Sequence, residues 1–422
     1  MAAGLLRFAT AGSVDDGKST LIGRLLYDSK SVFADQLSSV ERTSADRGDD
    51  YTNLALLTDG LRAEREQGIT IDVAYRYFST PARSFIVADT PGHVQYTRNM
   101  VTGASTADLA LVLVDARKGV VEQTRRHASL SALLRVPHLV LAVNKMDLVG
   151  FDQGVYDAVV AEFRAFAASL DIPDVTAIPM AALQGDNVVH ASDSTPWYDG
   201  PALLEHLEAV HVEREEAALR PARFPVQYVI RPMSVERPDY RGYAGTLAAG
   251  TLRPGDEVVV LPSGRRTSVS GIDTFDGPLD AATAGQAVTL RLTDDIDVSR
   301  GDMVVAADRP PAVASSFEAT VCWMDEAPLR AGRRVLVKHT TRTVKAVVAS
   351  LHDRLDVTSL SSSPASELAL NDIGRVTLRT AAPLLADDYV TDRRMGAFIL
   401  IDEVTGTTAG AGMIGSALGL RA

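Results

Sequence analysis

The sequence has a single cysteine, no long apolar run and no excess of basic residues, and each shortage excludes a class of protein. Cys322 is alone among 422 residues, so no disulfide can form within the chain, which suits a reducing cytoplasm. No apolar run approaches the roughly 18 residues that span a bilayer, so we expect no membrane role. Acidic residues outnumber basic ones by 54 to 42, a formal charge of -12, so we expect no nucleic-acid partner.

The hydrophobic pattern divides the chain into two kinds of texture. From Leu5 to about Val210, short apolar runs alternate with helix-length amphipathic stretches, a pattern typical of a parallel sheet covered by helices. The expected strands are LRFATA, SFIVADT, LALVLVDA, HLVLAVNKMD and VTAIPMAA. The expected helices include YTRNMVTGAS, EQTRRHASLSALLR and the stretch PALLEHLEAVHVEREEAALR. Residues 28–67 fit no pattern, and long irregular segments in compact domains tend to be functional.

After this region the chain changes to short alternating strands separated by Gly, Pro and Asp, in two blocks. Alternation around Cys322 predicts a buried strand in the second block, and the Pro-rich stretch ADRPPAVASS between the blocks is predicted to be a linker or an edge crossing. We therefore expect an α/β domain, a mostly parallel sheet with helices on both faces, followed by two small all-β barrels. The expected bounds are 1–215, 222–311 and 314–417.

The strongest motif is TAGSVDDGKST, in which Gly12, Gly17, Lys18 and Ser19 complete a P-loop between a strand and a helix. Glycines let the backbone approach phosphates, and successive amides with the helix N-terminus attract anions. Lys18 is expected to neutralise the β- and γ-phosphates, and the Ser19 hydroxyl to bind Mg²⁺. The expected phosphate-binding residues are Gly12, Ser13, Val14, Asp15, Asp16, Gly17, Lys18, Ser19, Thr20 and, further along, Gly92. The carboxylates of Asp15 and Asp16 are expected to point away from the phosphates.

The base is predicted from NKMD, residues 144–147, at the end of an expected strand. Asp147 can accept two hydrogen bonds from guanine that adenine cannot donate, and a site built around such donors rejects the analogue lacking them by roughly 10⁴- to 10⁵-fold. Asn144 can reach the other edge of the base and the stem of Lys145 can cover its face. We expect the base to be bound by Asn144, Lys145, Asp147, Ala181, Ala182 and Leu183, with the Ala182 amide as a donor to guanine O6. The predicted ligand is GTP.

Two further motifs are predicted to sense the γ-phosphate. In ADTPGH, Asp89 is placed to hold Mg²⁺ through water and the Gly92 amide to contact the γ-phosphate. His93 is the candidate catalytic residue, orienting the attacking water, although a solvent-facing histidine at a helix start would fit the same pattern. In REQGITID, Thr70 is the second candidate Mg²⁺ ligand, a role that rests on its order and spacing with the other motifs. The predicted metal ligands are Ser19, Thr70 and Asp89.

In the order of these motifs, and in the two β-blocks that follow, the chain resembles the translation-factor GTPases related to elongation factor Tu. Those proteins usually carry Gly-His-Val-Asp-His-Gly-Lys in the loop, whereas this chain has Asp16 at the second histidine. With LTDGLRAEREQGITIDVAYRYF, DTPGHVQYTRNMVTGAS, TPWYDGPALLEHLE and VKHTTRTVKA, the loop resembles the sulfate-activating branch, the GTPase subunits of sulfate adenylyltransferase. Ala181 departs from the family, which usually has Ser there.

The resemblance implies Mg²⁺-dependent GTP hydrolysis, coupled to the formation of adenosine 5′-phosphosulfate and pyrophosphate from ATP and sulfate by a separate catalytic subunit in the cytoplasm. One P-loop is present, so we expect no adenylylsulfate kinase module in this chain. The remaining histidines predict no metal site; His206 and His211 lie five residues apart on one presumed helix. Two alternatives stay open: an elongation factor Tu-like carrier of aminoacyl-tRNA, and a GTP-binding interaction protein without coupled catalysis.

Overall fold

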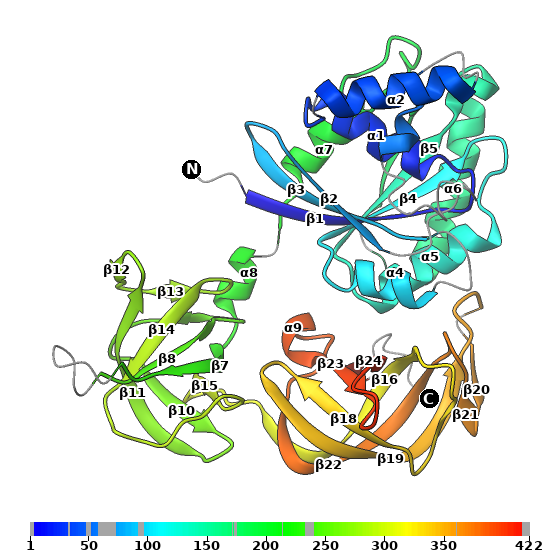
Figure 1. Ribbon diagram of the computed structural model, residues 1–422. Helices are drawn as coiled ribbons and strands as arrows, with labels where there is room; N and C mark the ends of the chain where they lie inside the picture. Colours follow the sequence, from blue (N-terminus) through cyan, green and yellow to red (C-terminus); the bar gives the residue numbers. More distant parts are fainter. Residues whose placement is uncertain are drawn as a thin grey trace. The chain divides into compact units, whose positions relative to one another are not determined.

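The computed structural model describes residues 4–32, 34–47, 52–57, 73–91, 97–170, 172, 175–212, 214–232, 240–359 and 361–415. These residues form two compact units (Figure 1). The first contains the chain up to His211, and the second contains nearly all of the rest.

The first unit is built on a six-stranded sheet in the order β2-β3-β1-β4-β5-β6. Its strands are β1 (Gly4–Ala11), β2 (Ala74–Ser79), β3 (Arg83–Asp89), β4 (Leu109–Asp115), β5 (His138–Asn144) and β6 (Val175–Pro179). β2 runs antiparallel to β3, and the other neighbours are parallel. Every residue of β4 is buried, as expected for a strand covered on both faces. The predicted α/β architecture is confirmed.

Helices cover both faces of this sheet; Figure 1 shows α1 and α2 on one side and α4 and α5 on the other. The helices are α1 (Lys18–Asp28), α2 (Ala34–Arg47), α4 (Thr97–Ala104), α5 (Glu122–Leu133), α6 (Gln153–Ser169) and α7 (Leu203–Ala209), with short 3₁₀ turns η1 (Leu54–Leu57) and η3 (Met146–Val149). α2 and η1 lie in the segment that the sequence pattern left unassigned. They pack against each other, and α2 carries only two large apolar side chains, Leu37 and Val40, so its apolar pattern is weak.

The prediction of one helical stretch over 201–220 is wrong. α7 ends at Ala209, and a second helix, α8 (Arg214–Leu219), begins after the break. Val210 adopts an extended conformation with ψ 132°, and its carbonyl accepts a hydrogen bond from Arg83 Nη1 at 2.7 Å. The contact with Arg83, the first residue of β3, holds Val210 in a non-helical conformation, so α7 ends before it. His211 therefore does not share a helix with His206.

The second unit contains two antiparallel barrels. In the first, β10-β15-β7-β8-β14-β11 form a ring that closes because β10 also pairs with β11; in the second, β18-β23-β24-β16-β22-β19 close through β18 and β19. The first ring comprises β7 (Arg223–Ile230), β8 (Gly242–Thr246), β10 (Glu257–Leu261), β11 (Arg265–Thr274), β14 (Ala287–Leu292) and β15 (Met303–Ala306). The second comprises β16 (Ala312–Trp323), β18 (Arg334–His339), β19 (Arg342–Leu355), β22 (Ile373–Ala386), β23 (Ala397–Ile401) and β24 (Thr408–Ile414).

Shorter elements complete this unit: β9 (Thr251–Leu252), β12 (Gly277–Pro278), β13 (Ala282–Thr283), β17 (Leu329–Arg330), β20 (Ser362–Pro364), β21 (Glu367–Leu368) and α9 (Arg393–Gly396). Each barrel has its own apolar core, the first around Phe224 and Tyr243 and the second around Trp323. The predicted barrels are confirmed, and Cys322 is buried in β16 as expected. The predicted linker over 307–316 is too long, because β16 begins at Ala312 and pairs with Ala386.

No helix among the residues that the structure describes is both long and apolar enough to cross a membrane.

Candidate nucleotide-binding site

The P-loop joins the end of β1 to the start of α1 at the carboxyl edge of the parallel sheet. Gly17 has φ 94°, and a Cβ there would lie 2.5 Å from Asn144 Nδ2, so both the backbone conformation and the close approach require glycine. At Gly12 a Cβ would lie 3.1 Å from the carbonyl oxygen of Leu113. The first intrahelical bond of α1 joins the Leu21 amide to the Gly17 carbonyl at 2.9 Å. The amides of Lys18, Ser19 and Thr20 therefore lack intrahelical acceptors, as at any helix start. Together with the helix dipole they create a positive potential that attracts anions.

Lys18 is buried at the centre of the loop, with an exposed fraction of 8%. Its ammonium donates to the carbonyl oxygens of Gly12 at 2.8 Å and Ser13 at 3.1 Å. Burial lowers the pKa of Lys18, while the charges of Asp89 and Asp16 act in the opposite direction. In the described part of the chain no carboxylate lies within ion-pair distance of this ammonium, so its charge is balanced only from further away.

The two loop aspartates differ, which corrects the prediction that both point outward. Asp15 is exposed, with φ 68°. Asp16 is 2% exposed, and its Oδ2 accepts a hydrogen bond from the Ser13 amide at 2.6 Å. Burial raises the pKa of Asp16, whereas the Ser13 amide and Lys18 lower it. Asp16 therefore stabilises the loop from within, because its carboxylate accepts the backbone amide of a residue in the same loop. Ser13 and Val14, which precede the two aspartates in the loop, are half-buried.

Asn144 connects the P-loop to the loop after β6. Its Nδ2 donates to the Asp16 carbonyl at 2.8 Å, and its Oδ1 accepts from the Ala182 amide at 2.9 Å. A side-chain amide has two N–H hydrogens, so one remains to reach a base. The Ala182 amide has one hydrogen, and here it is engaged by Asn144. The predicted donor to guanine O6 is thus in competition with an internal contact that the sequence did not reveal.

Lys145 lies beside Asn144 and contacts two other segments. Its backbone is left-handed, with φ 62°. Its Nζ donates to the Asp15 carbonyl and lies 3.1 Å from Asp115 Oδ2. Burial alone would raise the pKa of Asp115, but hydrogen bonds from Arg117 and Lys145 outweigh it and hold that pKa well below its usual range.

Asp147 is the second residue of the turn η3 and is half-buried. Its Oδ2 accepts a hydrogen bond from Gln184 Nε2 at 3.3 Å. Ala181 is buried at 1% exposure, and Leu183 is 40% exposed. The Arg24 guanidinium from α1 donates to the carbonyl of Leu183. The structure therefore brings the predicted base-binding residues and the P-loop to one edge of the sheet.

The residues that would hold Mg²⁺ fit that ion in part. Ser19 lies in the first turn of α1, and Asp89 ends β3 with 2% exposure, accepting the Thr10 hydroxyl at 3.1 Å. Among the described residues no group of three His, Cys, Asp or Glu side chains could hold a metal. A hydroxyl and one carboxylate suit an ion that takes its remaining ligands from water and nucleotide phosphates, as Mg²⁺ commonly does. Thr70, Gly92 and His93 lie outside the described residues.

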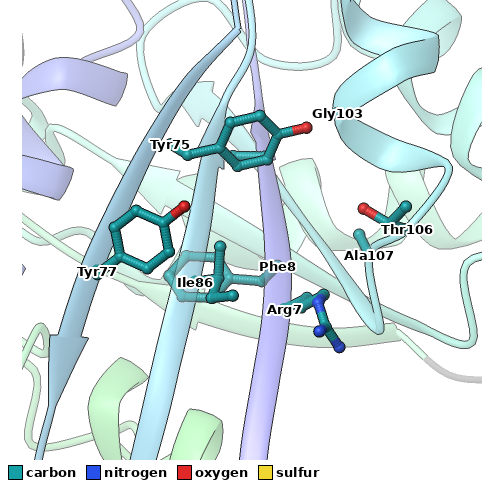
Figure 2. A pocket seen from close by; sticks show the side chains of 9 residues that line it. Arg7, Phe8, Tyr75, Tyr77, Ile86, Gly103, Thr106 and Ala107 are labelled. Carbon is teal, nitrogen blue, oxygen red and sulfur yellow. The ribbon is translucent and has the colours of Figure 1, made fainter. Parts of the chain in front are cut away.

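A cavity of about 170 Å³ lies away from this site, over β1, β2 and β3 beside α4 (Figure 2). Arg7, Tyr75, Tyr77 and Ile86 are among the residues that line it, and none of the predicted site residues is. It is therefore distinct from the phosphate and base sites.

Sequence reasoning missed three contributors to the site. Asp115 anchors Lys145, Thr10 donates to Asp89, and Arg24 braces the loop at Leu183. Only Asp115 carries a recognisable signal: it is a carboxylate at the last position of a fully apolar strand, where side chains reach the ligand edge of a parallel sheet.

Comparison with known proteins places the chain among GTP-binding proteins. The family model for the elongation factor Tu GTP binding domain matches residues 4–214. The model for the GTP-eEF1A C-terminal domain-like family matches residues 316–415. These matches confirm the predicted relationship to elongation factor Tu and a GTP-binding first domain.

Individual relatives are similar over nearly the full chain. The Bifunctional enzyme CysN/CysC of Mycobacterium tuberculosis (strain CDC 1551 / Oshkosh) is 62% identical, over 97% of this chain and 67% of that protein. Sulfate adenylyltransferase subunit 1 of Laribacter hongkongensis (strain HLHK9) is 53% identical, over 98% of this chain and 85% of that protein. A crystal structure of sup35 complexed with GDP is 25% identical over 98% of this chain and 94% of that chain, with a TM-score of 0.44, which is too low to support an argument about fold.

Proposed function

This chain belongs to the sulfate adenylyltransferase subunit 1 family, and from that premise we propose that it is the GTP-hydrolysing subunit of a sulfate-activating enzyme. A separate catalytic subunit would form adenosine 5′-phosphosulfate and pyrophosphate from ATP and sulfate. The observation that carries the proposal is the connection of the base loop to the phosphate loop: Asn144 holds the Asp16 carbonyl, and Lys145 holds the Asp15 carbonyl.

The residues of this edge have separate roles in the proposed reaction. Lys18 and the first amides of α1 bind the β- and γ-phosphates, and Asp147 selects guanine. Ser19 and Asp89, with Thr70, would hold Mg²⁺, which neutralises charge on the phosphates when it is bound. His93 orients the attacking water, and the Gly92 amide contacts the γ-phosphate.

Coupling requires that the GTP and GDP forms differ in affinity for some step of the partner's cycle, because equal affinity shifts no equilibrium. The sulfate–phosphate anhydride is a high-energy product, so a second hydrolysis tied to the cycle can draw its formation forward. The segments that carry Thr70, Gly92 and His93 are the ones we propose to change with the γ-phosphate. We therefore expect the affinity of the partner to depend on these segments.

The competing function is an elongation factor Tu-like carrier of aminoacyl-tRNA. The net charge of -12 favours the sulfate-activating role, because a tRNA carrier gains affinity from basic side chains on phosphates. Asp16 also favours this role, because translation factors usually carry a histidine at that position of the loop.

We also propose a cytoplasmic location, because a single cysteine suits a reducing compartment. The proposed domain bounds are 1–215, 222–311 and 314–417.

The test is GTP hydrolysis by the purified chain, alone and with the catalytic subunit of an ATP sulfurylase, with ATP and sulfate added in turn. The expected result is hydrolysis that rises only when partner, ATP and sulfate are all present, together with GTP-dependent product formation. His93→Ala should lose the hydrolysis and keep GTP binding. Hydrolysis indifferent to all three additions would reject the proposal, and tRNA binding would be measured next. Unchanged hydrolysis in His93→Ala would reject that residue's role.

A further inference from the structure

Asp115 is a buried carboxylate that contacts the proposed base site from a neighbouring strand. It is the last residue of β4, in register with Asn144 at the end of β5, and it is 1% exposed. Its Oδ2 lies 3.1 Å from Lys145 Nζ. A buried carboxylate is costly unless charged donors satisfy it, and among the described residues Lys145 and Arg117 are the cations that pair with Asp115.

Lys145 is held at both ends of its side chain. Its backbone adopts a left-handed conformation, with φ 62°, which a non-glycine residue keeps only where its surroundings enforce it. Its ammonium is bound by the carboxylate of Asp115 and by the carbonyl of Asp15 in the P-loop. The backbone conformation fixes one end of the side chain, and Asp115 and the Asp15 carbonyl fix the ammonium at the other end. The aliphatic stem between these ends therefore has little freedom to leave its position.

We propose that Asp115 is a positioning residue for guanine nucleotide binding. It holds the Lys145 ammonium, so it keeps the stem of Lys145 over the base and keeps the P-loop tied to the end of β5. This inference rests on the proposed function and on the role predicted for Lys145, whose stem covers the face of the base. Asp115 touches no part of the nucleotide in this role. It acts through Lys145.

The simpler explanation is that Asp115 only closes the turn after β4, and the contacts allow the two roles to be separated. Asp115 Oδ1 accepts from the Arg117 amide and from Arg117 Nε, each at 3.0 Å. Oδ2 accepts from Arg117 Nη2 at 2.7 Å and faces Lys145. An asparagine at position 115 can still accept the Arg117 amide through its oxygen, but it offers no charge to the ammonium of Lys145.

The experiment is a double-mutant cycle on GDP release, measured with a fluorescent GDP analogue by stopped flow on the full chain. Asp115→Asn should release GDP about tenfold faster, the usual scale for losing a charge-assisted hydrogen bond. Inosine diphosphate should be affected by the same factor, because Lys145 covers the ring face and reads no exocyclic group. In a Lys145→Met background, Asp115→Asn should change release by less than about twofold.

Arg117→Ala is the matched control, because it removes the other cation from the same carboxylate and leaves the Asp115–Lys145 contact. It should change GDP release by less than about twofold. Asp115→Ser, whose hydroxyl can still accept the Arg117 amide, repeats the test if Asp115→Asn does not fold.

Three outcomes would overturn the inference. An unchanged release rate in Asp115→Asn would show that Lys145 needs no anchor. An equal acceleration with methionine at position 145 would show that Asp115 acts through the turn. If Lys145→Met itself left GDP and GTP binding unchanged, the proposed base site would fail as well, which distinguishes that failure from the first two.

Discussion

The buried cation of the P-loop, in the first unit, is held differently from two buried charges of the second unit. In the second unit, Asp353 is 6% exposed, and its Oδ2 lies 2.6 Å from Arg375 Nη2. Arg223 is also 6% exposed, and its Nε lies 2.8 Å from Asp387 Oδ2. In the first unit, Lys18 is equally buried but donates to backbone carbonyls. The pairs of the second unit lie away from the proposed site, and we expect them to stabilise the fold. Among the described residues the Lys18 ammonium has backbone carbonyls as its hydrogen-bond partners, and we expect its charge to serve a ligand.

The largest effect should come from removing that cation. Lys18→Met should weaken GTP binding by about 100-fold, since a charged hydrogen-bond donor to the phosphates contributes up to about 3 kcal/mol. The midpoint of thermal unfolding should stay the same or rise, because burial lowers the pKa of Lys18 and so disfavours its charged form in the folded state. Fluorescence titration and calorimetry measure the two quantities. A fall in the midpoint would show that Lys18 serves the fold as Arg375 does.

The opposite result is expected for the barrel pair. Arg375→Met leaves the Asp353 carboxylate buried without its cation, and it should lower the free energy of unfolding by about 1–2 kcal/mol, less than for a fully buried pair because 34% of the Arg375 side chain is exposed. GTP affinity should not change. Urea unfolding followed by circular dichroism measures the first, and the same titration the second. A loss of GTP affinity here would remove the contrast between the units.

The smallest effect is expected at Asp16, where the loop carries a buried carboxylate. Burial raises the pKa of Asp16, so the folded state favours the protonated form, and its contribution to stability is lost as pH rises through the folded-state pKa. Asp16→Asn should therefore melt higher than the parent at pH 7, by about 2 °C. This difference should shrink as the pH falls toward the usual aspartate value of 3.8.

Asp15→Asn is the control, since it removes the same charge from the exposed neighbour in the same loop and should leave the melting temperature at pH 7 unchanged. A lower melting temperature for Asp16→Asn at pH 7 would mean that the carboxylate charge itself, through the Ser13 amide, stabilises the loop.

Much of the fold and the site could be predicted from the sequence because their determinants are local. Apolar runs such as LALVLVDA mark buried parallel strands, and the P-loop and NKMD sit at strand ends. Most of what could not be predicted depends on contacts between distant segments. The helix break at Val210 depends on Arg83. The inward turn of Asp16 depends on a local contact with the Ser13 amide, three residues earlier, which the residue types of the loop do not reveal. The engagement of the Ala182 amide by Asn144 likewise has no signature in the sequence.

The most direct test of the account is a change of nucleotide at Asp147. Asp147→Asn places an amide donor opposite the C2 position, so it should prefer xanthosine nucleotides, whose C2 oxygen accepts a hydrogen bond, over guanosine nucleotides. In the assay with the catalytic subunit, ATP and sulfate, XTP should support product formation by this variant and GTP should not. Two results would contradict the account: product formation by the variant that still requires GTP, or product formation that requires neither nucleotide. Either would show that guanine recognition at this edge of the sheet does not control sulfate activation.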